Sequence, residues 1–226
     1  MQNRQSVQLE VQDWGILAYG EAFERQKSLV RRRCADSVHD CLVLTEHAPV
    51  ITVGRSGSAD DLNTPVKTLL GRGVDVAMVD RGGKATYHGP GQLVAYPVIK
   101  LHTRDLHSYL EKLMNTAAAV LRAYGLDPHR IQGRPGLYID DAKIASVGIA
   151  LRKWVTYHGL ALNVNLDLTA FDWIVPCGQP GQEMTSMAKL LGRPLKIEEV
   201  KTMFLGRFAE IFGYSIKTHW GQKVAA

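Results

Sequence analysis

A glycine-rich segment directly before an apolar run places the strongest constraint on this chain. Residues 81–99 read RGGKATYHGPGQLVAYPVI, in which Gly82-Gly83 and Gly89-Pro90-Gly91 stand on either side of Tyr87 and His88. Glycine is costly to order and is useful where the backbone adopts unusual dihedral angles or approaches another molecule closely. The segment is therefore either a structural turn or the wall of a ligand site.

Spacing excludes several common kinds of site. The phosphate-loop pattern GxxxxGK[ST] is absent, and so is the dinucleotide-binding pattern GxGxxG followed by a helix. The chain also lacks HxH, HExxH and any Cys/His cluster with the spacing of zinc ligands, and it has no GxSxG nucleophile turn. We therefore expect neither a phosphate loop nor a zinc site nor a serine hydrolase.

Hydrophobic spacing predicts both helices and strands. Helices are expected at 105–124, stopped by Gly125, at 197–212, stopped by Gly213, and at 14–33, with Asp13 as the N-cap. Strands are expected at 6–11, twice within 40–55 on either side of a turn at 46–49, and at 74–79, 92–99, 137–151 and 154–164. In this arrangement strands pair mostly with near neighbours in the sequence, which favours an α+β or mixed-sheet fold. No linker-like stretch divides residues 1–226, so we expect a single domain.

Composition and charge limit the class of partner. The formal net charge of +5 favours acidic partners in general. Basic residues are scattered apart from Arg31, Arg32 and Arg33, which we expect at the end of a helix. The sequence has no basic stripe with interleaved aromatic residues, so we do not expect it to bind nucleic acid. The N-terminus lacks a secretory signal, and no apolar run approaches about 20 residues. A cytoplasmic protein that does not enter a membrane is expected.

Cysteine usage leaves one candidate nucleophile. The three cysteines are odd in number and form no CxxC pair, which argues against a disulfide framework. Cys34 and Cys41 fall at a helix terminus and a strand start and are interpreted as structural. Cys177 lies in the turn-rich segment IVPCGQPGQ, where a thiol can meet solvent, so it is either inert or a nucleophile.

A nucleophilic thiol needs a partner, since a free cysteine with a pKa of about 8.5 is mostly protonated at neutral pH. Lys143 stands inside an apolar strand pattern, where its side chain must either point to solvent or be held in a site. His88 and His158 are rival bases, because each lies between a tyrosine and a glycine and could line a cavity. The residues alone leave this choice open.

The order of these segments resembles a known family. Residues 81–99, then KIASVG at 143–148, YHGLALNVNLDL at 157–168 and PCG at 176–178 closely resemble the octanoyl-ACP:protein octanoyltransferases of lipoate biosynthesis. The segment EHAPVITVGR at 46–55 is similar to the upstream strand pair of that family. The resemblance covers roughly residues 46–189.

The resemblance implies a fold and a mechanism. The fold would be that of the biotin and lipoate protein ligase catalytic domains, with a mixed central sheet, a smaller sheet and packed helices. Cys177 would take the octanoyl group as a thioester, while Lys143 would favour its thiolate and later accept a proton from the incoming amine. The acyl pocket would be lined by Arg81, Gly82, Gly83, Lys84, Ala85, Thr86, Tyr87, His88, Ser146, Val147, Gly148, Gly159, Leu160 and Ala161. The amide following Ser146 or Cys177 is expected to stabilise the oxyanion.

The implied partners are proteins. The donor would be octanoyl-acyl carrier protein, and the acceptors would be the lipoyl domains of 2-oxoacid dehydrogenase complexes and the glycine cleavage H protein. Transfer from a thioester to an amine is downhill, so no cofactor, neither ATP nor a metal, is expected. An ATP-dependent lipoate or biotin protein ligase on the same scaffold is the main alternative, and a non-catalytic carrier-protein binding module is a second one.

Overall fold

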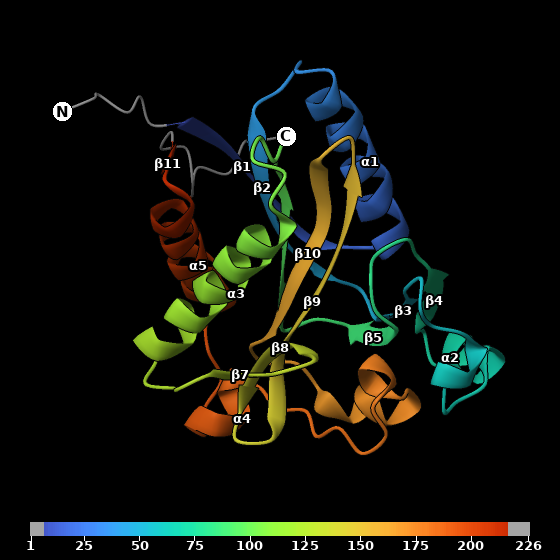
Figure 1. Ribbon diagram of the computed structural model, residues 1–226. Helices are drawn as coiled ribbons and strands as arrows, with labels where there is room; N and C mark the ends of the chain where they lie inside the picture. Colours follow the sequence, from blue (N-terminus) through green and yellow to red (C-terminus); the bar gives the residue numbers. More distant parts are fainter. Residues whose placement is uncertain (1–6, 217–226) are drawn as a thin grey trace.

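Two sheets of unequal size organise the molecule, as the computed structural model shows for residues 7–216 (Figure 1). The large sheet has the order β11-β1-β2-β6-β10-β9-β8-β7. Its strands are β11 (Tyr214–Ile216), β1 (Val7–Leu17), β2 (Asp40–His47), β6 (Gln92–Val98), β10 (Val155–Asn163), β9 (Ala142–Arg152), β8 (Arg134–Ile139) and β7 (His129–Ile131). The small sheet has the order β4 (Asp75–Met78), β3 (Val50–Val53) and β5 (Ala85–His88). Because β1 pairs in parallel with β2 and β11 while the other pairs of the large sheet are antiparallel, the predicted mixed sheet is confirmed.

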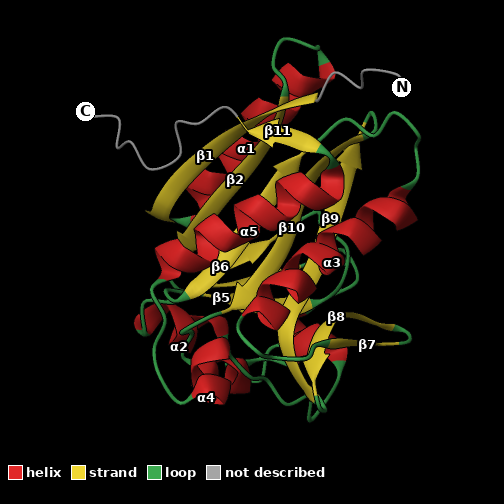
Figure 2. Ribbon diagram, turned by 90° about the vertical axis from the view of Figure 1, so that its left-hand side faces the viewer, coloured by secondary structure: helices red, strands yellow, loops and turns green. Residues whose placement is uncertain are grey.

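Helices cover both faces of the large sheet. Helices α3 (Leu106–Ala123) and α5 (Ile197–Phe212) pack side by side on one face, and α1 (Tyr19–Cys34) packs on the other (Figure 2). Strand β2 shows how the sequence specifies this layering, since side chains alternate between the two faces of a strand. Leu42 and Leu44 enter the core beneath α3 and α5, whereas Cys41 and Val43 enter the core beneath α1.

The two long amphipathic helices on that first face follow their sequence signals. The carboxylate of Asp105 caps α3 by accepting the backbone N–H of Ser108 at 2.9 Å. Gly213 ends α5 in the left-handed conformation, with φ of 78°, which costs little at glycine. The helices expected at 105–124 and 197–212 are thus confirmed. No helix within residues 7–216 is long and apolar enough to cross a membrane.

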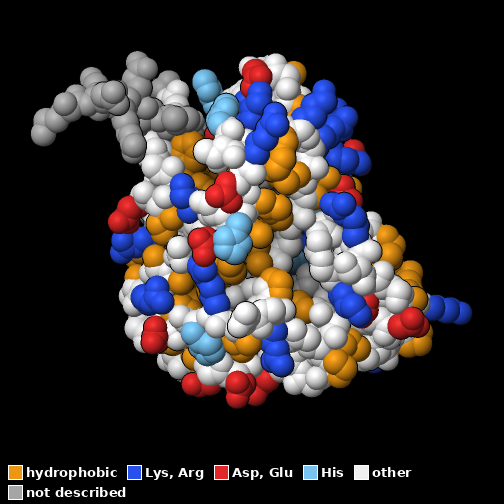
Figure 3. All heavy atoms as spheres, viewed as in Figure 1, with side chains coloured by type: hydrophobic (Ala, Val, Ile, Leu, Met, Phe, Trp, Pro, Cys, Tyr) orange, Lys and Arg blue, Asp and Glu red, His pale blue; other side chains and the backbone are white. Residues whose placement is uncertain are grey.

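The predicted helix at 14–33 was wrong at its start. Strand β1 continues to Leu17, paired with His47 of β2, and α1 begins only at Tyr19. Asp13 is therefore no N-cap; its carboxylate accepts the backbone N–H of Gly15 and pairs with Lys201 of α5. Long-range pairing with β2 outweighed the local helical spacing. The basic end of α1 is as expected, and Lys and Arg side chains are densest at that end in Figure 3.

Two further boundaries differ from the prediction. The expected strand at 137–151 is divided into β8 and β9 by a turn at 140–141, where Asp140 has a φ of 49°. Residues 85–88, which lie outside the expected strands, form β5 because they pair with β3 along the register Val50↔His88. Short elements missed by the sequence complete the fold: β7, β11, α2 (Val66–Gly71), α4 (Met187–Leu191) and the 3-10 turns Ala59–Asp61, Leu168–Trp173 and Pro176–Gly178.

A separate core joins the small sheet to the later part of the chain. Ile51 of β3 and Tyr87 of β5 pack with Phe171 and Ile174, which precede the turn that carries Cys177. The backbone there is also tied down, because the N–H of Val175 donates to the carbonyl of Asp61 at 2.8 Å. This packing places Cys177 between the small sheet and the large one.

Candidate active site

A cavity of about 200 Å³ lies where the two sheets meet the turn of Cys177. Its walls come from β5 with the loop before it, from β6, β9 and β10 of the large sheet, and from Cys177 itself. All but one of the predicted pocket residues line it: Arg81, Gly82, Gly83, Lys84, Ala85, Thr86, His88, Ser146, Val147, Gly148, Gly159, Leu160 and Ala161. The structure thus brings together residues from positions 81–88, 146–148, 159–161 and 177 of the sequence.

Tyr87 is the exception. Its ring packs edge-on against Phe171 and Trp173 in the core of the small sheet, at centroid distances of 6.0 and 6.1 Å, and it does not line the cavity. Side chains alternate along β5, so Thr86 and His88 face one way and Ala85 and Tyr87 the other; Ala85 still lines the cavity, whereas the larger Tyr87 ring lies in the core of the small sheet. The expectation that every residue of 81–88 lines the pocket ignored that alternation.

Several lining residues were not singled out by sequence reasoning. They are Tyr19, Val94, Tyr96, Gly133, Pro135 and Gln179. Tyr19 opens α1 far from the glycine segment and carries no local signal. Tyr96 lies within 81–99 and could have been found by extending the wall along β6.

Lys143 and Cys177 are in direct contact. Lys143 Nζ lies 3.0 Å from Cys177 Sγ. The lysine side chain is buried, with 1% exposure, and within residues 7–216 it forms no ion pair with a carboxylate. The Lys143 side chain is therefore held inside the protein and does not point to solvent.

The chain that follows Cys177 fixes the backbone of Lys143. The N–H of Lys143 donates to the carbonyl of Glu183 at 2.8 Å, and the N–H of Thr185 donates to the carbonyl of Lys143 at 2.9 Å. Residues 183–185 therefore run parallel to β9 and form a single β-bridge with it, between Met184 and Lys143. This return of the chain sets the lysine and the thiol in register with each other.

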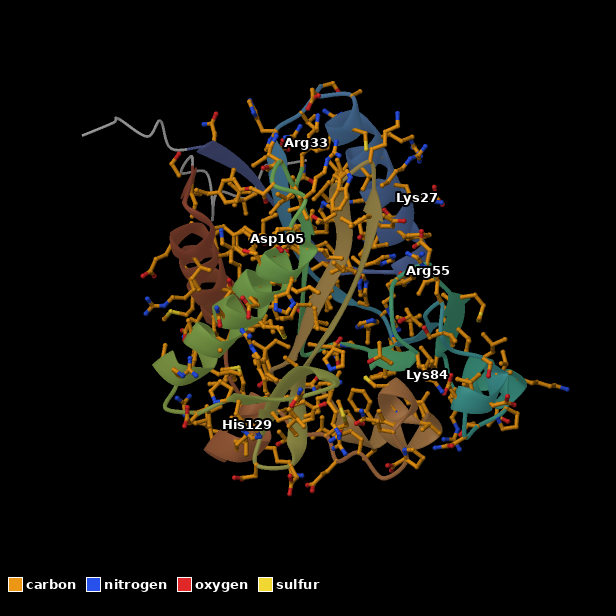
Figure 4. The ribbon with its side chains drawn as sticks, in the orientation of Figure 1. Lys27, Arg33, Arg55, Lys84, Asp105 and His129 are labelled. Carbon is orange, nitrogen blue, oxygen red and sulfur yellow. The ribbon has the colours of Figure 1, made fainter. Side chains whose placement is uncertain are left out.

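Cys177 occupies an unusual backbone conformation. Its φ of 55° and ψ of 20° are left-handed, a region that non-glycine residues rarely adopt, and Gly178 follows with φ of 68°. A Cβ on Gly178 would lie 2.2 Å from Cδ of Lys84, so the lysine stem runs directly over this turn. Figure 4 shows Lys84 between β5 and the segment that carries Cys177. Strained residues of this kind cluster at functional sites.

Arg81 brings a buried cation to the cavity. Its guanidinium donates to the carbonyl of Thr52 at 2.7 Å, to Oγ1 of Thr52 at 2.8 Å and to the carbonyl of Gly82 at 3.0 Å. It forms no ion pair with a carboxylate among the described residues, and burial lowers its pKa. A thiolate at Cys177 would interact favourably with this charge.

His88 and His158 are hydrogen-bonded to side chains other than Cys177. Burial lowers the pKa of His88 to about 3, and its Nδ1 is hydrogen-bonded to Oε1 of Gln92 at 2.7 Å. Burial also lowers the pKa of His158, although Asp80 accepts a hydrogen bond from its Nε2 at 2.7 Å and opposes that effect. Both rings line the cavity in the neutral form at pH 7, and neither is in hydrogen-bond contact with Cys177.

The other cysteines differ from Cys177. Cys41 is buried with 1% exposure, and burial raises the pKa of its thiol. Cys34 is half-buried at the end of α1, where its Sγ donates to the carbonyl of Arg152. Neither lines the cavity, which agrees with their interpretation as structural. Within residues 7–216, no three His, Cys, Asp or Glu side chains gather as metal ligands would.

Comparison with known proteins places the chain in a family. The family model of the lipoyl protein ligase A/B catalytic domain matches residues 18–209. The chain belongs to this family. Its curated relatives include the octanoyltransferase of Rubrobacter xylanophilus, 41% identical over 88% of this chain and 91% of the relative, and that of a Roseiflexus species, 43% identical over 90% and 87%. The family identified from the sequence and its class, an acyltransferase, are confirmed.

Solved structures confirm the predicted fold. A putative lipoate protein ligase from T. acidophilum with bound lipoic acid superposes with a TM-score of 0.74 at 16% identity, covering 93% of this chain and 88% of that one. Lipoate-protein ligase A bound with ATP gives a TM-score of 0.70 at 18% identity, covering 95% and 90%. At such low identity the likeness concerns the fold alone.

Proposed function

We propose that this family member transfers an octanoyl group from octanoyl-acyl carrier protein to a lysine of a lipoyl domain, through a thioester on Cys177. The observation that carries the proposal is the 3.0 Å contact between Lys143 Nζ and the Sγ of Cys177, the member of the pair that lines the cavity. A buried ammonium without a carboxylate partner is costly, and a thiolate at this distance offsets that cost. The contact therefore favours the ammonium–thiolate pair, which is the nucleophilic form of cysteine.

The first half-reaction consumes that ion pair. The thiolate of Cys177 attacks the carbonyl carbon of the donor thioester, and the bond to the carrier sulfur breaks. The departing thiolate takes a proton from the Lys143 ammonium. The products are the acyl-Cys177 thioester, a free carrier thiol and a neutral Lys143 amine.

The second half-reaction restores the pair. The amine of the acceptor lysine attacks the acyl-Cys177 carbonyl, a C–N bond forms and the C–S bond of Cys177 breaks. The proton lost by the attacking nitrogen goes to the neutral Lys143 amine. The enzyme returns to ammonium and thiolate, so neither ATP nor a metal enters the balance.

The oxyanion of both tetrahedral intermediates needs a donor, and Val147 is the better of the two expected ones. The N–H of Gly178, which follows Cys177, already donates to the carbonyl of Val175 at 3.0 Å. In β9 the carbonyl of Ile149 faces away from β10, because it accepts the N–H of Gly82. The N–H of Val147, two residues earlier, faces the same way and thus the cavity side.

Partners follow from this chemistry. The donor and acceptor are both proteins that must reach the cavity mouth, and the net charge of +5 favours acidic ones through electrostatic steering. Lipoyl domains of 2-oxoacid dehydrogenase complexes and the glycine cleavage H protein are the acceptors we propose. Such a reaction suits a cytoplasmic enzyme.

The test is transfer without ATP. Purified protein, octanoyl-acyl carrier protein and an unmodified lipoyl domain are mixed, and all three proteins are weighed by mass spectrometry. We expect a gain of one octanoyl group on the lipoyl domain and an acyl adduct that maps to Cys177. Product formed only from free octanoate and ATP would instead indicate a ligase, and no product under either condition would indicate a binding module.

Matched variants assign the site in the same assay. Cys177→Ala should abolish transfer, and Lys143→Ala should reduce it by about 10²- to 10⁴-fold, the usual contribution of a positioned proton-transfer group. Cys34→Ser is the control thiol variant and should retain full transfer. An acyl adduct on Cys34 or Cys41 would overturn the assignment of Cys177 while leaving the reaction intact.

A further inference from the structure

Two residues of strand β8, Tyr138 and Gly136, lie against the Lys143 side chain, and neither has a part in the transfer reaction described above. Lys143 Nζ lies over the Tyr138 ring, 5.5 Å from its centroid, within the range of a cation–π interaction. Tyr138 is fully buried, so this contact is shielded from solvent. Among the described residues, the ammonium of Lys143 interacts with two groups, the Cys177 thiol and the Tyr138 ring.

Gly136 makes room for the stem of the same lysine. A Cβ at this position would lie 2.6 Å from Cε of Lys143 and 2.3 Å from the carbonyl oxygen of Ala145. Its φ of 128° is also one that L side chains rarely adopt. Any larger residue at 136 would therefore displace either the backbone of β9 or the Lys143 side chain.

A register shift brings the two residues opposite each other. Leu137 pairs with Ala145, but Tyr138 pairs with Lys143, so Ile144 is an extra residue in β9. In a regular antiparallel ladder Tyr138 would face Ile144 instead. Such bulges re-aim side chains and are common beside active sites. Here the bulge presents Lys143 to the Tyr138 ring.

We propose that Tyr138 is a positioning residue of the Lys143–Cys177 pair. Its ring stabilises the charged form of Lys143 and holds Nζ beside Sγ, with Gly136 providing the space for the lysine stem. Tyr138 thereby sets how much of Cys177 is thiolate at neutral pH. This inference rests on the proposed role of the pair, and it adds a residue that touches neither donor nor acceptor.

Alkylation of Cys177 tests the proposal without any acyl substrate. The probe is iodoacetamide, applied from pH 5 to pH 10 in a Cys34→Ser background, with the modified residue mapped by mass spectrometry. Tyr138→Leu removes the ring, and we expect the neutral-pH alkylation rate of Cys177 to fall several-fold, at most about thirtyfold, with the pH profile displaced to higher pH. Tyr138→Phe keeps the ring and should restore the wild-type profile. The hydroxyl of Tyr138 is buried with no hydrogen-bond partner among the described residues, so its loss should not matter.

A matched control separates this effect from loss of packing. Tyr109 is another buried tyrosine, on α3, whose ring packs edge-on against Phe212. Tyr109→Leu should lower thermal stability to a similar extent and leave the alkylation profile of Cys177 unchanged. If Tyr138→Leu does not fold, Tyr138→Met fills the space better without a ring and gives the same readout.

The outcomes distinguish the two proposals. A wild-type profile in folded Tyr138→Leu or Tyr138→Met, or an equal displacement in Tyr109→Leu, would overturn the role of Tyr138. If Tyr138→Leu displaces the alkylation profile but the wild-type protein transfers no octanoyl group, the positioning role of Tyr138 stands and the proposed reaction is wrong. Transfer together with a displaced profile is the expected result.

Discussion

Lys143 Nζ lies 3.0 Å from Cys177 Sγ in a region that excludes solvent from the lysine. The chain holds a second lysine at 1% exposure, Lys201, and treats it differently. Lys201 pairs with the carboxylates of Asp13 and Glu198, each at 3.0 Å. The partner of Lys143 is therefore a thiol, whereas the partners of Lys201 are carboxylates. A buried lysine beside a thiol is the arrangement expected of a reactive pair.

Replacing each buried lysine by methionine should separate function from stability. Lys143→Met removes a buried cation whose partner, Cys177, can take up a proton and stay neutral, so we expect the free energy of unfolding to stay constant or rise by about 1 kcal/mol or more, while octanoyl transfer falls by about 10²- to 10⁴-fold. Lys201→Met leaves two carboxylates without their partner and should lower the free energy of unfolding while retaining transfer. Urea denaturation and the transfer assay measure both quantities. A larger loss of stability in Lys143→Met than in Lys201→Met would contradict this account.

Two glycines of the Cys177 turn should respond unequally to alanine. Gly178 and Gly181 both have positive φ, 68° and 75°, so each substitution carries a similar backbone cost of about 1–2 kcal/mol. Only Gly178→Ala also drives a methyl group against the Lys84 stem, since a Cβ at Gly181 meets nothing within 4 Å. We expect Gly178→Ala to reduce transfer at least tenfold more than Gly181→Ala, with similar melting temperatures. Equal activities in the two variants would show that contact with Lys84 does not shape the turn.

Local sequence signals predicted elements that are stabilised locally. Helices α3 and α5 were predicted because their apolar residues recur on one face and because Asp105 and Gly213 mark an end of each. The start of α1 was missed because Trp14 to Leu17 satisfies helical spacing, yet Ile16 and Leu17 pair with β2 thirty residues away. Pairing at that distance leaves no mark within the segment itself.

The site shows the same division. Cys177 and Lys143 could each be singled out from their surroundings, but their contact depends on the bulge at Ile144 and on the return of residues 183–185 to β9. Only the resemblance to a family joined them beforehand. Tyr138 escaped notice because it reads as an ordinary core residue, and its ring acquires a role only through that bulge.

Acidification should destabilise the protein before most carboxylates titrate. Burial lowers the pKa of His47 to about 4 and that of His88 to about 3, from the ordinary value of 6.5. Below pH 6.5 the unfolded chain binds a proton at each histidine that the folded protein does not, so folding loses free energy as the pH falls toward 4. The slope is about 1.4 kcal/mol per pH unit for each histidine, and the lowered pKa of His158 acts in the same direction.

Urea denaturation at pH 7.5, 6 and 5 measures this slope. His47→Gln removes one of the two strongly shifted groups and should lower the slope by about 1.4 kcal/mol per pH unit, whatever its effect on stability at pH 7.5. His107, whose side chain is 87% exposed, provides the control, and His107→Gln should keep the wild-type slope. A flat wild-type profile between pH 6 and 5, or an unchanged slope in His47→Gln, would mean that these rings are protonated inside the fold. That result would also remove the basis for treating His88 as a neutral part of the cavity wall.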